Sequence, residues 1–282
     1  MSAAGYSVPF KGKWHLSKRL GADWAPEDVN QYGFERWNPP DAGANQDIDQ
    51  FGGGNPNNDG RFMNDAGAVE TGGEGVFEYL TSAAAQQQPF FLIVSLVNPH
   101  DVLSYPRTYA SGGYTSNDLG GEIGLPDTVD EDLGEKPTAQ QATLLLLNAG
   151  LGPLNTEQKK LDYLNFYGNL TIESDTYLVD ILDTLENENL LENTLVIQTS
   201  DHGEMGLTHG GQRQKIFNFY EETLRVRSDT QSDHRLAAPP SGPSAMAYPS
   251  RLCGPAAIPA PANPAIPAPA ACPRTSWPRY SC

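Results

Sequence analysis

Cysteine is missing from most of this chain, because Cys253, Cys272 and Cys282 are the only three and all lie near the C-terminal end. The main body therefore has no disulfide framework, and cysteine usage does not indicate a compartment. No apolar run reaches the roughly 18 residues that a membrane-spanning helix needs, so we expect no membrane span. Residues 1–6 lack the charged and apolar regions of a signal peptide, and we expect none in this chain.

Positive charge is also scarce, with 18 Lys and Arg against 35 Asp and Glu and a net charge of -17. This balance argues against nucleic acid as a partner. Any anionic substrate must find a local positive pocket in an acidic surface, and lysines close to histidines are the places to look for one. No acidic residue follows Asp233, although arginines continue to Arg279.

The chemistry-bearing residues concentrate in the stretch 193–215. Residues 194–199 form a short β-branched apolar run, which predicts a buried strand. Asp201 and His202 follow it directly, and His209 and Lys215 come next. In an open α/β sheet ligands bind at the carboxyl ends of strands, where an Asp-His pair can give an oxygen and an imidazole to one cation. The alternative is a polar loop without a metal.

A second group of basic residues follows a strand candidate at residues 6–10. On an extended backbone Lys11, Lys13 and His15 would share one face of the strand. Two cations and an imidazole on one face suit a sulfate or phosphate group. The alternative is a solvated edge strand.

A third group follows residues 90–97, which are apolar on both faces as a central covered strand requires. Pro99 ends the strand, and His100 would lie at the same carboxyl edge as Asp201. Without further evidence, His100 would be a hydrogen-bonded loop residue. Helical periodicity is predicted for residues 75–88 and for a long helix capped by Thr156. The strand at 90–97, this helix and the strand at 194–199 would form a parallel, right-handed crossover unit.

Three motifs in this order resemble the sulfatase family of the alkaline-phosphatase-like superfamily: Gly12-Lys-Trp-His-Leu16, residues 89–101 ending in Asn-Pro-His-Asp, and Ser200-Asp-His-Gly-Glu204 with His209 and Lys215. The resemblance covers roughly residues 5–226. It implies an α/β fold with a mixed, mostly parallel central sheet flanked by helices. We therefore expect a partial catalytic domain at 1–227 and an Ala/Pro-rich tail at 228–282, which is predicted to be disordered.

The resemblance also implies roles for individual residues in the hydrolysis of sulfuric esters. Lys13 and Lys215 would hold the sulfate oxygens, His15 would be a base, and His100 would contact the sulfate or protonate the leaving oxygen. Asp201 and His202 would be metal ligands, and His209 would orient their loop from behind. The implied cation is divalent, calcium first, with magnesium, manganese or zinc as alternatives. The implied substrate is a small-molecule or glycan sulfate ester.

The family's nucleophile is a formylglycine made in a Cys-x-Pro-x-Arg motif that precedes Gly-Lys-Trp-His. Only eleven residues precede Gly12 here and none is cysteine, and the family's early paired aspartates are missing too. Cys253-Gly-Pro255 lacks the arginine and lies at the wrong end. We therefore expect this polypeptide alone to be inactive as a sulfatase, although relatives are often exported, active enzymes.

Two alternatives remain open. Asp-His at 201 and 202 also resembles the phosphonate- and phosphate-ester branch of the superfamily, whose substrates share the tetrahedral geometry of sulfate. From a different class, the chain would be a non-catalytic remnant that binds an anion. The tail after Arg227 is either a genuine linker or the product of a shifted reading frame.

Overall fold

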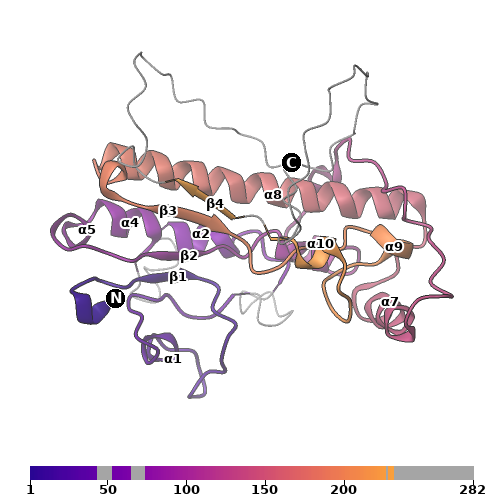
Figure 1. Cartoon of the computed structure of the whole chain (residues 1–282), viewed down its shortest axis with the longest axis horizontal. Coiled ribbons are helices and arrows are strands. Elements are labelled where there is room, and N and C mark those ends of the chain that lie inside the picture. Colours follow the sequence, from indigo (N-terminus) through magenta and orange to yellow (C-terminus); the bar gives the residue numbers. More distant parts are fainter. Residues whose placement is uncertain (43–52, 65–73, 227, 232–282) are drawn as a thin grey trace, which may run out of the picture.

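The computed structural model describes residues 1–42, 53–64, 74–226 and 228–231. One long helix, α8 (Glu157–Asn187), spans most of the molecule, and short strands and helices lie beneath it (Figure 1). The combination of helices with a small parallel sheet confirms the predicted α/β class. The remaining elements are β1 (Phe10–Gly12), α1 (Glu27–Asn30), α2 (Asn58–Met63), α4 (Val76–Thr81), α5 (Ala83–Gln87), β2 (Ile93–Ser95), η4 (His100–Ser104), α6 (Tyr109–Gly112), α7 (Thr138–Leu151), β3 (Val196–Thr199), α9 (Thr208–Gly211), α10 (Glu221–Leu224) and β4 (Ser228–Gln231), with single 3-10 turns at Ser2–Ala4 (η1), Ser116–Leu119 (η5) and Leu191–Asn193 (η6).

Strands β1 and β2 form a parallel pair. Phe10 lies opposite Ile93 and Gly12 lies opposite Ser95. An isolated bridge between Ser7 and Phe90 extends the contact toward the N-terminal ends of both strands. β2 lies within the predicted range 90–97 but is shorter, whereas β1 overlaps the predicted range 6–10 only at Phe10. Parallel pairing puts both carboxyl ends at one edge of the sheet.

The predicted parallel crossover from β2 through α8 to β3 is wrong in its pairing. In the described part of the chain β3 instead pairs antiparallel with β4, in a sheet of its own. Its side chains alternate between half-buried and exposed, and Ile197 is 57% exposed. β3 is therefore covered on one face only, whereas its apolar composition had predicted a strand that is buried on both faces.

Helix α8 begins where the sequence predicts. The Thr156 hydroxyl oxygen accepts a hydrogen bond from the Lys159 N–H at 3.2 Å, which satisfies one free donor of the first turn. The first half of the helix packs on a cluster built around Tyr163 and Phe166. The second half packs through Ile181 and Leu185 on α4 and on both β2 and β3. The helix therefore connects the two ends of the core.

An aromatic cluster packs against β1. Phe10, Trp14, Val29 and Trp37 are its buried members. The Trp14 ring stacks on Tyr32 with centroids 5.3 Å apart. This packing fixes the segment that leaves β1.

Lys11 does not share a face with Lys13 and His15, so that prediction is wrong. Its ammonium group is fully buried and donates to the Asn38 side-chain oxygen at 3.2 Å, with the Glu74 carboxylate at 3.6 Å. The strand ends at Gly12, whose φ of 112° breaks the alternation of faces. Burial lowers the pKa of Lys11 to about 8, and Glu74 opposes this decrease.

The helix predicted at residues 75–88 is confirmed, but Ser82 divides it into α4 and α5 because its backbone is extended. Helix α7 was not predicted. It lies between Pro137, its N-cap, and Gly152, whose φ of 98° ends the helix. Both are familiar boundary residues, but the leucine-rich run between them has no clear apolar face.

The buried carboxylate of Asp59 in α2 fixes the backbone just after β2. Its two oxygens accept the N–H groups of Val97 at 2.5 Å and Asn98 at 3.0 Å. Burial raises the pKa of Asp59 to about 7, although the two backbone donors oppose the increase. The chain that leads into His100 is thus tied to a separate helix.

The C-terminal segment is described only in part. Residues 228–231 form β4, just past the predicted boundary, and residues 232–282 lie outside the described residues. The division at 227/228 therefore stays a prediction. Within the described ranges, none of the helices has the length and apolar character needed to cross a lipid bilayer.

Replacing Phe166 with alanine tests the core beneath α8. Phe166 is fully buried and its ring centroid lies 4.8 Å from that of Tyr114. We expect the free energy of unfolding to fall by about 3–5 kcal/mol because the change leaves a cavity. Ile172→Ala on the same helix is the control, since Ile172 is 64% exposed, and should change stability by about 0.5 kcal/mol or less. Equal losses in urea denaturation would contradict this core.

Stability should also depend on pH through Asp59. Its pKa in the folded chain, about 7, lies above the ordinary 3.8, so the folded state keeps a proton that the unfolded chain has released. The free energy of unfolding therefore falls as pH rises across that window, by at most about 1.4 kcal/mol per pH unit. Asp59→Asn should lose less stability over the same window. Parallel slopes for both proteins in urea denaturation would rule out this contribution.

Candidate anion and metal site

Lys13 follows the carboxyl end of β1, where the backbones of β1 and β2 lie close together. Gly12 allows it, since a Cβ atom at that position would lie 2.0 Å from the Ser95 carbonyl oxygen. The Lys13 N–H donates to the same oxygen at 2.9 Å. The Lys13 backbone is therefore fixed by the parallel pair itself.

Asp41 holds the next two residues. Its carboxylate oxygens accept the N–H groups of Trp14 and His15, each at 2.7 Å. His15 is exposed and has a φ of 45°. Among the described residues, the His15 imidazole makes no hydrogen bond or ion pair with another predicted site residue. The structure fixes the backbone of His15 but does not bring its side chain into the cluster.

His100 opens η4 after β2, and its side chain is 22% exposed. Burial lowers the pKa of His100, and the neighbouring Lys13 and Lys215 lower it further, whereas Asp101 raises it. Burial likewise lowers the pKa of Lys13; Lys215 adds to this decrease, and Asp41, Asp201 and Asp101 oppose it. Lys13 and His100, from the first two strand ends, therefore lie within electrostatic reach of Lys215, which follows the third.

Asp201 and His202 follow β3, as predicted. The Asp201 Oδ2 atom lies 3.3 Å from His202 Nε2, and the Asp201 side chain is 85% exposed. His202 Nδ1 lies 2.7 Å from the Gly203 carbonyl oxygen, which can only accept, so Nδ1 carries the proton. Nε2 is therefore left as an acceptor, and the Lys215 ammonium contacts it directly.

A closed loop places Lys215 beside His202. The Glu204 carboxylate accepts the Gln214 N–H at 2.9 Å and the Tyr163 hydroxyl at 2.8 Å. Burial raises the pKa of Glu204, although these donors oppose the increase. Glu204 thus joins the two ends of the loop 204–214 and ties them to α8 through Tyr163. Lys215 is the next residue after this loop.

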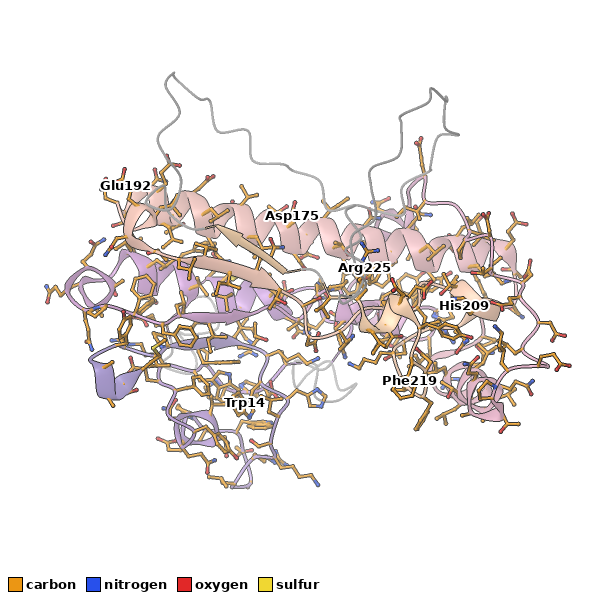
Figure 2. All side chains as sticks on the ribbon, in the orientation of Figure 1. Trp14, Asp175, Glu192, His209, Phe219 and Arg225 are labelled. Carbon is orange, nitrogen blue, oxygen red and sulfur yellow. The ribbon has the colours of Figure 1, made fainter. Side chains whose placement is uncertain are left out.

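His209 lies on α9 (Figure 2). Its Nδ1 is 2.7 Å from Glu131 and its Nε2 is 3.4 Å from Glu222. Its ring stacks on Tyr220, with centroids 3.9 Å apart. These contacts join the segment around residue 131 to α10. An orienting role for His209 stays a prediction.

The donor atoms fit a divalent cation in part. Asp201 Oδ2 and His202 Nε2 lie 3.3 Å apart, a separation that two ligands of one ion can have, but the Lys215 ammonium contacts Nε2 in this structure. Calcium takes six to eight oxygen ligands, and magnesium takes six ligands. Among the described residues no group of three or more His, Cys, Asp or Glu is placed to hold a metal ion. Asp201 and His202 by themselves are fewer donors than either ion takes.

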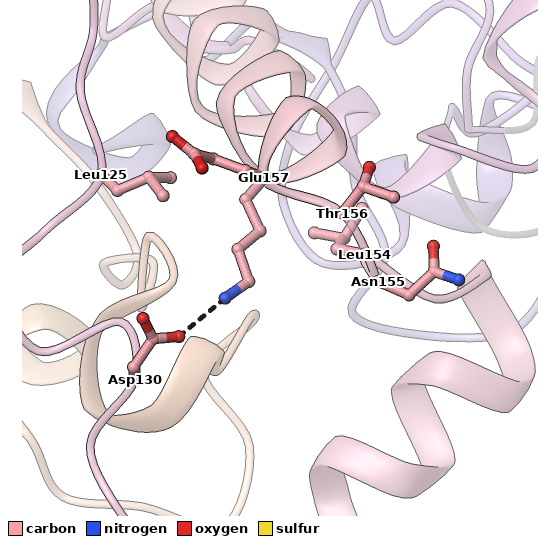
Figure 3. Close-up of a pocket in the computed structure, with 7 residues that line it drawn as sticks. Leu125, Asp130, Leu154, Asn155, Thr156 and Glu157 are labelled. Atoms are coloured by element: carbon pink, nitrogen blue, oxygen red, sulfur yellow. Dashed lines mark hydrogen bonds and ion pairs between the residues drawn. The ribbon is translucent and has the colours of Figure 1, made fainter.

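Two neighbouring cavities lie elsewhere, at the start of α8. One of about 360 Å³ is lined by Leu125, Leu154 and Thr156, and Lys160 crosses it to Asp130 at 3.0 Å (Figure 3). The other, of about 270 Å³, shares Lys160 with the first. None of the predicted site residues lines either one. The candidate site is instead an open cluster at the strand ends.

Sequence reasoning missed the carboxylates that hold this cluster in place. Asp41, Asp59 and Asp101 are all buried. Asp41 and Asp59 lie in loop-rich sequence without periodicity, so nothing in their own surroundings marks them. Asp101 stands beside His100, and that adjacency was the one available signal.

Comparison with known proteins gives the family to which the chain is similar. The sulfatase family model matches residues 1–227. The ulvan-active sulfatase of Formosa agariphila is 24% identical over 211 residues, which is 72% of this chain and 34% of that protein. This chain therefore spans about a third of the length of that relative.

Solved structures share the fold. A Bacteroides thetaiotaomicron protein provisionally classed as a sulfatase has a TM-score of 0.54 at 23% identity, covering 82% of this chain and 45% of its own. A 2-O GAG sulfatase has a TM-score of 0.53 at 20% identity, covering 82% and 44%. The family match over most of the chain, together with the shared fold, shows that this chain belongs to the sulfatase family.

Proposed function

We propose that the strand ends form the binding site for the sulfate group of a sulfuric ester. One observation carries the proposal: the Lys215 ammonium lies close enough to lower the pKa of both Lys13 and His100, and these three residues come from three separate segments. Gathering like charges is unfavourable by itself, and an oxyanion between them would reverse that cost. In this reading Lys13 and Lys215 hold the sulfate oxygens, and His100 contacts the group or gives a proton to the leaving oxygen.

Asp201 and His202 would hold a divalent cation next to this anion site, with calcium as the first choice. When bound, such a cation would polarise a sulfate oxygen. His15 would act as the base that the resemblance implies, which requires its exposed imidazole to turn toward the site.

The complete reaction is sulfuric ester hydrolysis. The Cys-x-Pro-x-Arg motif that would supply its nucleophile is not in this sequence. A glycan or small-molecule sulfate ester is the proposed substrate. The relative named for ulvan and the neighbour named as a 2-O GAG sulfatase support that choice.

Inorganic sulfate is the direct probe of the anion site. We expect Lys13→Ala and Lys215→Ala each to weaken sulfate binding by about tenfold or more, because each removes a charge-assisted hydrogen bond. Lys159→Ala is the control, since Lys159 is partly exposed at the start of α8, where its ammonium group donates to the Asn155 side-chain oxygen at 3.2 Å. Calorimetry at constant ionic strength measures all three. Equal affinity in all variants would refute the site, and a parallel phosphate titration separates the sulfate reading from the phosphate-ester alternative.

Metal binding tests the second half of the site. With two ligands from this chain we expect weak calcium binding, with a dissociation constant of about a millimolar or above. Asp201→Asn and His202→Ala should each abolish the calorimetric signal. Asp130→Asn is the control, because Asp130 is equally exposed but lies at the cavity beside α8. Calcium binding that survives both site substitutions would show that these residues are not ligands.

A further inference from the structure

Two buried polar atoms face each other beside the candidate site. His100 Nδ1 and Asp101 Oδ1 lie 3.7 Å apart. Neither atom has a hydrogen-bond partner among the described residues, and neither is exposed to solvent. Buried polar atoms rarely remain unpaired, because losing water without a replacement costs free energy. Each is therefore the available partner of the other, and a small movement closes the bond.

The rest of Asp101 is already held. The Tyr114 hydroxyl donates to Oδ2 at 3.0 Å, and the Ser104 hydroxyl donates to the Asp101 carbonyl oxygen at 2.7 Å. Burial raises the pKa of Tyr114, so this hydroxyl keeps its proton and remains a donor. Oδ1 is the carboxylate oxygen that remains to accept a hydrogen bond.

We propose that Asp101 is a positioning residue that keeps a proton on His100 Nδ1, directed at Oδ1, and so presents Nε2 to the anion site. A carboxylate can only accept, which selects this tautomer. Nδ1 is buried while the side chain as a whole is 22% exposed, so its exposed surface belongs to atoms other than Nδ1. The tautomer follows from this geometry alone, whereas its use in ester hydrolysis rests on the proposed function.

The same contact would decide whether His100 can carry a second proton. Three charged side chains act on its imidazole: Lys13 and Lys215 oppose protonation, and Asp101 favours it. Without the carboxylate, burial and two ammonium groups would keep the ring neutral. With it, Nε2 can hold a proton that is available to a leaving oxygen.

Nitrogen NMR of the full chain labelled with ¹⁵N-histidine reads the tautomer directly. The chain has 5 histidines, and His100→Gln assigns the resonance of interest. We expect neutral His100 to be protonated at Nδ1, with exposed His15 as the internal reference for an unconstrained ring. A wild-type His100 protonated at Nε2 would overturn the proposal without any variant.

Asp101→Asn tests the cause. Its amide oxygen can accept from Tyr114, and its NH₂ group then faces Nδ1, so the tautomer should reverse to Nε2–H and the pKa of His100 should fall. Tyr114→Phe is the matched control, because it removes only the bond to Oδ2 and should keep the wild-type tautomer. An unchanged tautomer in folded Asp101→Asn would contradict the proposal. If that variant does not fold, the wild-type and Tyr114→Phe spectra decide.

The same spectra separate this inference from the proposed function. Added sulfate should shift the His100 resonances if the anion site exists. An Nδ1–H tautomer that is insensitive to sulfate would leave the Asp101 contact standing and remove the anion site. The reverse result, a sulfate response from an Nε2–H tautomer, would keep the site and remove Asp101 from it.

Discussion

The parallel pairing of β1 with β2 is the constraint on which the candidate site depends. It brings the segments after Gly12 and Ser95 to one edge, where a glycine lets the two backbones approach. The Lys13 N–H donates directly to the Ser95 carbonyl oxygen of β2. The third segment, with Asp201 and Lys215, is placed by a different device, the Glu204 loop closed against α8.

Buried carboxylates do the local positioning at each strand end. Asp41 holds the residues after Lys13, Asp59 holds the residues before His100, and Asp101 faces the His100 ring. Each accepts specific donors, which offsets the cost of removing a carboxylate from water. An acidic chain thus uses some of its carboxylates as scaffold around the lysines of the proposed anion site.

Local patterns in the sequence were enough to predict the long helix from Thr156 and the approximate places of the strands, whereas the grouping of Lys13, His100 and Lys215 came from the resemblance to a family. Periodicity could not predict strand partners, because β3 pairs with β4 through contacts that no local pattern encodes. Face alternation failed for Lys11, since one residue, Gly12, changes the direction of the chain. Asp41 and Asp59 were not predictable because their partners lie about 26 to 39 residues away.

The central claim is that three strand ends converge on one oxyanion. A crystal of the chain soaked in selenate, which has the shape of sulfate and a strong anomalous signal, tests it most directly. The account predicts an anomalous selenium peak in contact with Lys13, His100 and Lys215. A crystal in which the strand ends are accessible but selenate binds only elsewhere, for example at Lys160 beside the start of α8, would contradict it.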